Sequence, residues 1–223
     1  MEKVLIAPSI LSGDFANMGK TVKDVTDWGA DLVHCDVMDG VYVPNFTFGM
    51  PMIKAIREYT TLPLDVHLMM TKPEEYVERF CDAGADIVTF HPEASLDPYK
   101  ALQKIKAKGK KCGLAFNPNV KIEDYEYLFV DCDLIVIMTV YAGYGGQKLI
   151  KECLKRAEYV NKRLVELGLH TLIEIDGGVT EENAKEVALT GADILVAGSA
   201  VFKSNDKVAT IKNLRNALNT SNE

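Results

Sequence analysis

The sequence has 223 residues, of which 48% are hydrophobic and 26% charged, and its formal net charge is −7. This composition is typical of a globular protein, and the acidic balance leaves no basic stripe to neutralise phosphates, so we expect no nucleic-acid partner. No apolar stretch approaches the length of a membrane span, which predicts no membrane association. The five cysteines lack zinc-ribbon spacing, and their odd number predicts reduced thiols in a cytoplasmic protein.

Eight short apolar runs predict buried β-strands. In chain order they cover Val4–Ala7, Leu32–Val37, Leu64–Leu68, Ile87–Phe90, Gly113–Phe116, Leu134–Met138, Leu172–Ile175 and Ile194–Ala197. Helical patterns lie between these runs, and proline at a first helical position predicts helix starts at Pro73 and Pro98. Apolar residues from Ile150 to Leu167 recur every three or four positions, as on one helix face, and Val208–Leu218 predicts a last amphipathic helix.

A short repeat gives the spacing of these units. Gly29-Ala30-Asp31-Leu32, Gly84-Ala85-Asp86-Ile87 and Gly191-Ala192-Asp193-Ile194 each follow a helical pattern and open an apolar run. The glycine suits the left-handed position just after a helix, and the spacing indicates a strand–helix unit of roughly 27 residues. Eight such units predict a single α/β domain over residues 1–223, a (β/α)8 TIM barrel. An open doubly wound sheet is the alternative, but its early glycine-rich motif is missing.

Polar side chains end three of the predicted strands. His34 and Asp36 are two residues apart in the second run, His67 ends the third, and Asp176 follows the seventh. Residues i and i+2 of a strand point to the same face, and the carboxyl ends of barrel strands meet around one active site. We therefore expect these four side chains to surround one divalent metal ion. Mixed nitrogen and oxygen ligands favour Zn, Fe(II), Mn or Co.

Two aspartates beside one metal ion predict a specific reaction. A ketose held by the ion loses a proton from a neighbouring carbon and passes through a metal-stabilised enediolate. One of Asp36 and Asp176 removes the proton from one face, and the other returns a proton to the opposite face, so that the carbon is inverted. This division requires one ionised and one protonated carboxyl group.

Glycines follow the last three predicted strands. They occur in Gly143-Tyr144-Gly145-Gly146, Gly177-Gly178 and Gly198-Ser199. Glycine lets backbone N–H groups approach an anion closely, and the loops after the last strands of a TIM barrel commonly hold phosphate. We therefore expect these segments to bind the phosphate of a small substrate.

Several other residues lie near strand ends. Met38, Met69 and Met138 are expected either to wall the intermediate from water or to fill the core. Ser9 is expected to contact the substrate, with an ordinary loop serine as the alternative.

Four polar residues are weaker candidates. We expect His91 to be a hydrogen-bonded structural histidine, Asp39 to shape its loop, and His170 to have no functional role. Asp65 is expected to hold a histidine of the metal site from one layer deeper.

The sequence closely resembles the ribulose-phosphate 3-epimerase family. The resemblance rests on Ala7-Pro8-Ser9-Ile10-Leu11, His34-Cys35-Asp36-Val37-Met38-Asp39-Gly40, Val43-Pro44-Asn45, His67-Leu68-Met69, Met138-Thr139-Val140, Gly145-Gly146-Gln147 and Asp176-Gly177-Gly178-Val179, and it continues through Phe202. It implies a ribulose-phosphate-binding barrel, an isomerase of the pentose phosphate pathway that inverts C3 between D-ribulose 5-phosphate and D-xylulose 5-phosphate.

The resemblance also implies roles for particular residues. It implies one metal ion held by His34, Asp36, His67 and Asp176, with Asp36 as the proton acceptor and Asp176 as the donor. It implies substrate contacts from Ser9, His67 and the glycine loops, and a homo-oligomer, either a dimer or a hexamer.

The resemblance breaks in the loop after the sixth predicted strand. The family commonly has Pro-Gly-Phe-Gly-Gly where this chain has Ala142-Gly143-Tyr144-Gly145-Gly146, and Tyr42 replaces a usual phenylalanine. Loss of proline adds an N–H donor and frees φ, so we expect a more mobile loop or a different path. The hydroxyls of Tyr141 and Tyr144 are expected near the phosphate.

Three alternatives stay open. The nearest changes only the sugar, to a ketohexose 6-phosphate such as allulose 6-phosphate, although Gly145 and Gly146 favour the pentose enzyme. A phosphate-binding-barrel lyase is less favoured because no lysine ends a predicted strand. A barrel that binds without catalysis is disfavoured by the presence of both Asp36 and Asp176.

Overall fold

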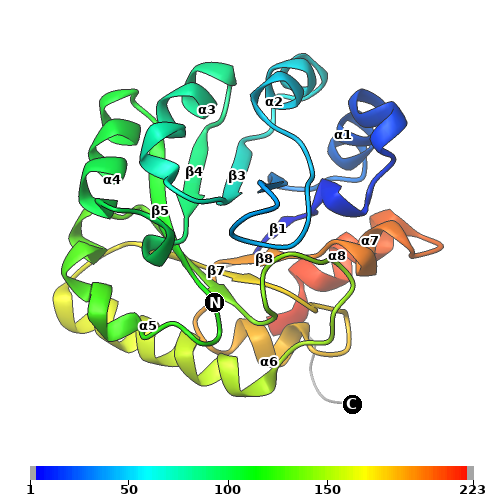
Figure 1. The fold of residues 1–223 in the computed structure, drawn as a ribbon. Coiled ribbons are helices and arrows are strands. Elements are labelled where there is room, and N and C mark those ends of the chain that lie inside the picture. Colours follow the sequence, from blue (N-terminus) through cyan, green and yellow to red (C-terminus); the bar gives the residue numbers. More distant parts are fainter. Residues whose placement is uncertain (1–3, 220–223) are drawn as a thin grey trace.

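The computed structural model of the protein describes residues 4–219 and contains a barrel of eight parallel strands surrounded by helices (Figure 1). The strands are β1 Leu5–Ala7, β2 Val33–Met38, β3 Leu64–Met69, β4 Ile87–Phe90, β5 Lys111–Phe116, β6 Leu134–Met138, β7 Leu172–Asp176 and β8 Ile194–Val196. They pair in the order β1-β8-β7-β6-β5-β4-β3-β2. The barrel closes where Ser9 pairs with His34, whose N–H donates to the Pro8 carbonyl at 3.1 Å. The TIM-barrel prediction is confirmed.

Every predicted strand is present in the described part of the chain, and its bounds differ from the prediction by two residues at most. The runs are largely apolar because both faces of these strands are covered. All six residues of β2 and all six of β3 are buried, as expected for parallel strands between a filled barrel interior and a ring of helices.

The helices lie on the outside of the barrel (Figure 1). They are α1 Met18–Asp27, α2 Met50–Ile56, α3 Val77–Ala83, α4 Pro98–Ala107, α5 Leu154–Leu167, α6 Ala184–Ala188, α7 Ser199–Phe202 and α8 Lys207–Arg215. α4 begins as predicted, because the Asp97 carboxylate accepts the Lys100 N–H at 2.9 Å and Pro98 occupies the first turn. Ten residues between β5 and β6, Ile122–Asp131, form 3-10 helix instead of α-helix.

Three predicted helix bounds are wrong. Pro73–Glu75 forms only a 3-10 turn and α3 begins at Val77, because the backbone leaves helical geometry at Tyr76 (φ −121°, ψ −23°) between them. Ile150 lies outside α5 because its backbone is extended and its N–H donates to the Thr139 carbonyl at 2.8 Å. At the C-terminal end, α8 stops at Arg215 and a 3-10 turn follows.

The Gly-Ala-Asp repeat acts at the strand junctions. Its three glycines have positive φ angles, as predicted for the residue after a helix: Gly29 83°, Gly84 116° and Gly191 93°. Each aspartate then accepts a backbone N–H of the preceding strand at 2.8–3.0 Å: Asp31 from Ile6, Asp86 from Leu64 and Asp193 from Ile173. The repeat therefore ties one strand to the next.

A fourth copy of this bond lacks the repeated sequence. Asp133 accepts the Cys112 N–H at 2.9 Å without a preceding Gly-Ala pair. Together the four aspartates, which precede β2, β4, β6 and β8, join each even-numbered strand to the strand before it, so the barrel has a fourfold pattern at its amino-terminal end.

We expect Asp133→Ala to lower the free energy of unfolding by about 1–3 kcal/mol, because it leaves a backbone N–H between two barrel strands without its acceptor. Urea denaturation measures the effect. Asp124→Ala, at an exposed position of the neighbouring 3-10 helix, is the control and should change the stability by less than about 0.5 kcal/mol. Equal stabilities of the two variants would show that the junction bond contributes nothing.

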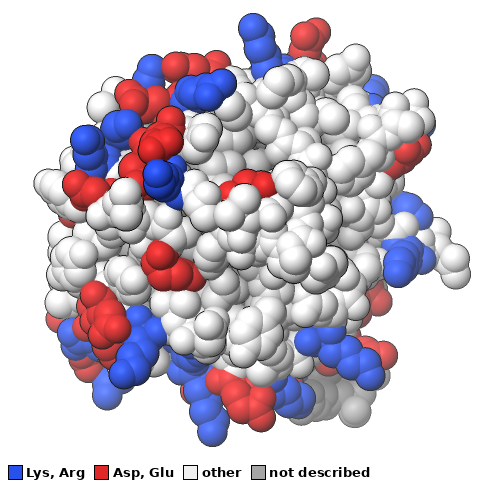
Figure 2. Space-filling model, viewed as in Figure 1, with Lys and Arg blue, Asp and Glu red and all other residues white. Residues whose placement is uncertain are grey.

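Charges of both signs are intermixed on the face of the molecule shown in Figure 2, without a region of one sign. Among residues 4–219, no helix is both long enough and apolar enough to cross a membrane. All five cysteines are buried and unpaired.

Candidate active site

The four predicted metal ligands meet inside the carboxyl end of the barrel. His34 and Asp36 lie on β2, His67 on β3 and Asp176 at the end of β7. Strand pairing places Asp36 beside His67, and the alternation of side chains along β2 turns His34 and Asp36 to the same side. One ligand atom from each of the four residues lies within 4.8 Å of all the others.

The distances define a compact set of two nitrogens and two oxygens. His34 Nε2 is 3.3 Å from Asp36 Oδ1 and 3.6 Å from Asp176 Oδ2. His67 Nδ1 is 3.5 Å from the same oxygen of Asp36 and 3.6 Å from that of Asp176. Four tetrahedral ligand atoms about 2.1 Å from a metal ion are roughly 3.4 Å apart. The spacing therefore fits a divalent cation.

The hydrogen bonding of the histidines supports the same conclusion. His34 Nε2 and His67 Nδ1 are buried and have no hydrogen-bond partner among the described residues. A buried ring nitrogen without a partner is costly, and a cation between the rings and the carboxylates would satisfy both nitrogens at once. This buried His/Asp cluster is consistent with a metal site.

Two buried acidic side chains contact His34 on the side away from the cavity. Asp65 Oδ2 lies 2.6 Å from His34 Nδ1, and Glu174 Oε1 lies 3.5 Å from it. The contact fixes Nδ1 as the protonated nitrogen and leaves Nε2 with its lone pair toward the cluster. Asp65 thus contacts a histidine as expected, and Glu174 is a partner that sequence reasoning missed.

Burial and neighbouring charges shift the pKa values of this cluster. Burial disfavours the charged form of His34, but the carboxylates of Asp36 and Asp65 raise its pKa well above the usual range. Burial likewise opposes ionisation of Asp36, but His34 and His67 lower its pKa, so this carboxylate is ionised. For Glu174, burial and the nearby Asp65 raise the pKa well above the usual range.

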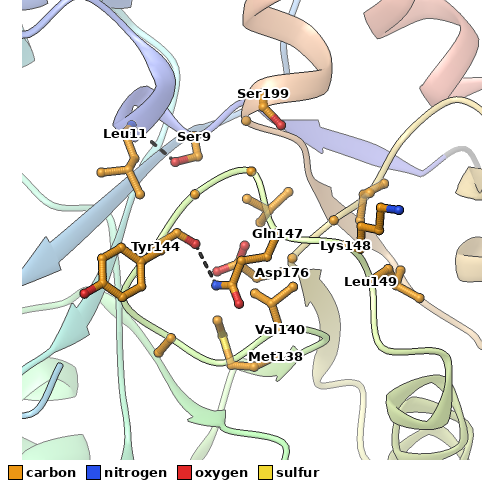
Figure 3. Close-up of a pocket in the computed structure, with 18 of the residues that line it drawn as sticks. Ser9, Leu11, Met138, Val140, Tyr144, Gln147, Lys148, Leu149, Asp176 and Ser199 are labelled. Carbon is orange, nitrogen blue, oxygen red and sulfur yellow. Dashed lines mark hydrogen bonds between the residues drawn. The ribbon is translucent and has the colours of Figure 1, made fainter. Parts of the chain in front are cut away.

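A cavity of about 460 Å³ opens above the cluster (Figure 3). Its lining includes every predicted substrate and wall residue apart from the buried His67: Ser9, Met38, Met69, Met138, Gly143, Tyr144, Gly145, Gly146, Gly177, Gly178, Gly198 and Ser199. Both Asp36 and Asp176 line it as well. Ser9 Oγ donates to Asp36 Oδ2 at 2.5 Å, so the serine positions this carboxylate. Residues not anticipated, including Leu11, Gln147, Lys148 and Asn183, complete the wall.

The backbone conformation at Gly178, in the loop after β7, has room only for glycine. Its φ is +68°, and a Cβ there would lie 2.3 Å from the Leu149 backbone nitrogen. The loops after β6 and β7 therefore approach each other as backbone against backbone. This leaves the cavity wall at that point without a side chain, the surface that anion binding through N–H groups requires.

We expect Gly178→Ala to raise KM for a phosphorylated substrate by at least about tenfold, because the added methyl group displaces the Leu149 backbone at the cavity wall. Gly168→Ala is the matched control: Gly168 has a similar φ of +65° but nothing within 4 Å of the added carbon. Its cost should be confined to about 1 kcal/mol of stability. Steady-state kinetics and thermal unfolding of both variants distinguish the steric clash with Leu149 from the strain of a positive φ angle. An unchanged KM in Gly178→Ala would contradict the assignment of this loop to phosphate binding.

The weaker candidates have structural contacts. His91 is fully buried, and its Nε2 lies 2.9 Å from His67 Nε2, while the Asp39 carboxylate accepts the N–H groups of Val41, Tyr42 and Thr71. His170 is exposed just before β7.

Hydrogen bonds hold the loop after β6 to neighbouring loops and to itself. The Ala142 N–H, which a proline would lack, donates to Asn117 Oδ1 at 3.1 Å. The Tyr144 hydroxyl donates to the Pro44 carbonyl at 3.1 Å, so it is engaged by the loop after β2. Gln147 Nε2 donates to the carbonyls of Tyr141 and Tyr144 at 2.8 Å, the second of these bonds being drawn in Figure 3.

The fold and the site together define a class of protein: a TIM barrel with a buried His/Asp cluster of metal-binding geometry under a glycine-lined cavity. Comparison with known proteins makes the assignment narrower. A profile of the ribulose-phosphate 3 epimerase family matches residues 5–202. This chain belongs to the ribulose-phosphate 3 epimerase family, and the resemblance seen in the sequence is confirmed.

Curated relatives cover nearly the whole chain. The ribulose-phosphate 3-epimerase of Bacillus subtilis is 46% identical over 213 residues, which are 95% of this chain and 98% of the relative. That of Escherichia coli K12 is 45% identical over 219 residues, 98% of this chain and 97% of the relative.

Solved structures with lower identity share the fold. The 3-hexulose-6-phosphate synthase of Salmonella typhimurium has a TM-score of 0.68 at 19% identity and covers 97% of this chain and 98% of its own. The orotidine 5′-phosphate decarboxylase of Pyrococcus horikoshii has a TM-score of 0.67 at 14% identity, with 97% and 100% covered.

Proposed function

We propose that this protein is a metal-dependent epimerase that inverts C3 of a ketose phosphate and interconverts D-ribulose 5-phosphate and D-xylulose 5-phosphate. The observation that carries the proposal is the placement of Asp36 and Asp176 at one cavity beside two histidine nitrogens. Family membership and the curated epimerases at 45–46% identity support the same reaction.

The two aspartates divide the proton transfers between two sides of the sugar. They come from β2 and β7, which are separated in the barrel by β1 and β8, so their carboxyl groups reach the cavity from different directions. Asp36 is ionised and held by Ser9, which suits it to accept the proton from C3. Asp176 then supplies a proton to the opposite face, and the two roles exchange in the reverse direction.

The metal site is proposed to consist of His34, Asp36, His67 and Asp176. A divalent cation there supplies positive charge that stabilises the enediolate formed when C3 loses its proton. Zn, Fe(II), Mn and Co all suit two nitrogen and two oxygen ligands. The side chains of His34 and His67 are fully buried, so they hold their positions while the carboxyl groups above them handle protons.

The phosphate is proposed to lie against the glycine loops after β6, β7 and β8, far enough from the acids for C3 to lie between Asp36 and Asp176. Met38, Met69 and Met138 are buried or nearly so at 5%, 1% and 2% exposure. They form an apolar floor that keeps water from the reacting carbon.

The experiment that tests this function is incubation of the pure protein with D-ribulose 5-phosphate in deuterated buffer with Zn²⁺, Mn²⁺ or Co²⁺. Deuterium at C3 together with formation of D-xylulose 5-phosphate is expected. A comparison of kcat/KM with allulose 6-phosphate distinguishes the pentose from the hexose substrate. No exchange with any of these metals would refute the proposal.

The family resemblance supports a proposal about assembly, and the cysteines support one about location. We propose a single-domain barrel that forms a homo-oligomer, a dimer or hexamer, in the cytoplasm, where the five buried thiols stay reduced. Light scattering of the purified protein measures the oligomeric state.

A further inference from the structure

A chain of hydrogen bonds crosses the mouth of the barrel outside the residues assigned to catalysis. It starts at Ala142 in the loop after β6, whose N–H donates to Asn117 Oδ1 at 3.1 Å. Asn117 Nδ2 donates to the Tyr42 hydroxyl at 2.6 Å, and this hydroxyl donates to Glu93 Oε1 at 2.6 Å. Each donor is oriented toward the Glu93 carboxylate, an arrangement in which consecutive bonds strengthen one another.

A second arm reaches the same carboxylate from the buried cluster. His67 Nε2 and His91 Nε2 are 2.9 Å apart, so one of them carries the hydrogen and the other accepts it. When Nδ1 of His67 serves as a metal ligand, its hydrogen is on Nε2, and His91 is left with its own hydrogen on Nδ1. That nitrogen lies 3.5 Å from Glu93 Oε1, an ion-pair distance without a hydrogen bond between the two. Both arms therefore lead to Glu93, the first by a hydrogen bond and the second by an electrostatic contact.

Two residues of the first arm contribute groups that a phenylalanine or a proline in their place would lack. These groups are the Tyr42 hydroxyl and the Ala142 N–H. The Tyr42 ring also packs on His91, with ring centroids 4.9 Å apart. Both Tyr42 and Ala142 pack against the cluster of Met38, Val43 and Met69 at the cavity wall.

We propose that Tyr42 and Glu93 are positioning residues that hold the loop after β6, residues 139–149, in a fixed place relative to His67. Other ties of this loop, from Asn45 Nδ2 to the Gly143 carbonyl and from the Tyr144 hydroxyl to the Pro44 carbonyl, reach the loop after β2. The Tyr42 hydroxyl connects the loop to Asn117 after β5 and to Glu93 after β4. Through Glu93 and His91 it is linked to the proposed metal ligand His67.

Amide hydrogen exchange tests the loop arm without reference to activity. In Tyr42→Phe the Asn117 side chain loses its acceptor, and we expect the Ala142 amide to exchange about three- to tenfold faster than in the wild type. Tyr127→Phe removes a hydroxyl from a side chain that is 66% exposed on the 3-10 helix Ile122–Asp131 and should leave this rate unchanged. Equal exchange rates in Tyr42→Phe and wild type would overturn the proposal.

Glu93→Gln tests whether the two arms are joined. Glutamine keeps the shape but removes the negative charge that the Tyr42 hydroxyl and the His91 ring both face, so Ala142 exchange should accelerate as in Tyr42→Phe. The affinity for Zn²⁺, measured by competition with a chelator, should fall by up to about tenfold in Glu93→Gln and stay unchanged in Tyr42→Phe. Equal Zn²⁺ affinities of Glu93→Gln and wild type would show that Glu93 does not position His67.

The kinetic test rests on the proposed function. We expect Tyr42→Phe to raise KM for D-ribulose 5-phosphate about three- to tenfold with kcat within about twofold, because the loop covers bound substrate but supplies no reacting group. Ala142→Pro breaks the same arm, so the double variant should resemble the worse single variant, and multiplied effects would contradict a shared arm. An inactive wild type would refute the proposed function alone, since the exchange experiment does not depend on it.

Discussion

Asp36→Asn and Asp176→Asn are each expected to lower the rate of interconversion of the two pentose phosphates by roughly 10³-fold, as expected for loss of a general acid or base. Asparagine keeps the shape of the side chain but neither takes up nor holds a proton at neutral pH. Since inversion needs a proton taken on one face and returned on the other, removal of either carboxyl group is enough to stop it.

Isotope exchange distinguishes the two variants from each other. With Asp176→Asn, Asp36 can still remove a proton from D-ribulose 5-phosphate and return a deuteron to the same face, so label enters this sugar without inversion. With Asp36→Asn, label should instead enter D-xylulose 5-phosphate. Mass spectrometry of each sugar after incubation in deuterated buffer shows the difference.

Two controls accompany these variants. Metal content must be measured, because an amide is a poorer ligand than a carboxylate, and Asp27→Asn on the exposed end of α1 should keep full activity. The two-carboxylate mechanism is wrong if either site variant loaded with metal still inverts C3 at the wild-type rate.

Removal of the metal ion is expected to lower activity by at least about 10²-fold, since the charge that stabilises the intermediate is lost. Addition of Zn²⁺, Mn²⁺, Co²⁺ or Fe²⁺ to the chelated protein should restore it. Thermal unfolding gives an independent measure: the wild type should become more stable on addition of the metal, whereas His34→Gln should respond much less. Full activity after verified removal of all metal would contradict the proposed site.

Metal binding should also depend on pH with a definite sign. In the metal-free protein the neighbouring carboxylates raise the pKa values of His34 and His67, although burial opposes this. An ion needs the ring nitrogens without their protons, so binding releases protons and the affinity falls as the pH falls below these raised pKa values. The expected slope is about tenfold per pH unit for each proton displaced, which titration at several pH values measures.

The barrel could be predicted from sequence because its signals are local. Each strand is a largely apolar run, and the spacing of His34 and Asp36 alone places both on one face of β2. Glu174 carried a similar signal, since it precedes Asp176 by two residues on an otherwise apolar strand. Its position on the inward face predicts a buried carboxyl group beside the site.

The hydrogen bonds around Glu93 could not be predicted in the same way. They join residues 51 and 75 positions apart in the chain, Tyr42 with Glu93 and Tyr42 with Asn117. Each of these residues looks like an ordinary polar loop residue until the barrel brings the loops together. The start of α3 was missed for a different reason, because the break in helical geometry at Tyr76 has no signal in the sequence.

The four aspartates at the strand junctions bear on how the chain folds. Each joins a strand to a residue only 20 to 25 positions away, so the entropy lost in closing each loop is small. We therefore expect the two-stranded units to form early and their pairing with one another to follow, with the contact between β1 and β8 last because it joins the two ends of the chain.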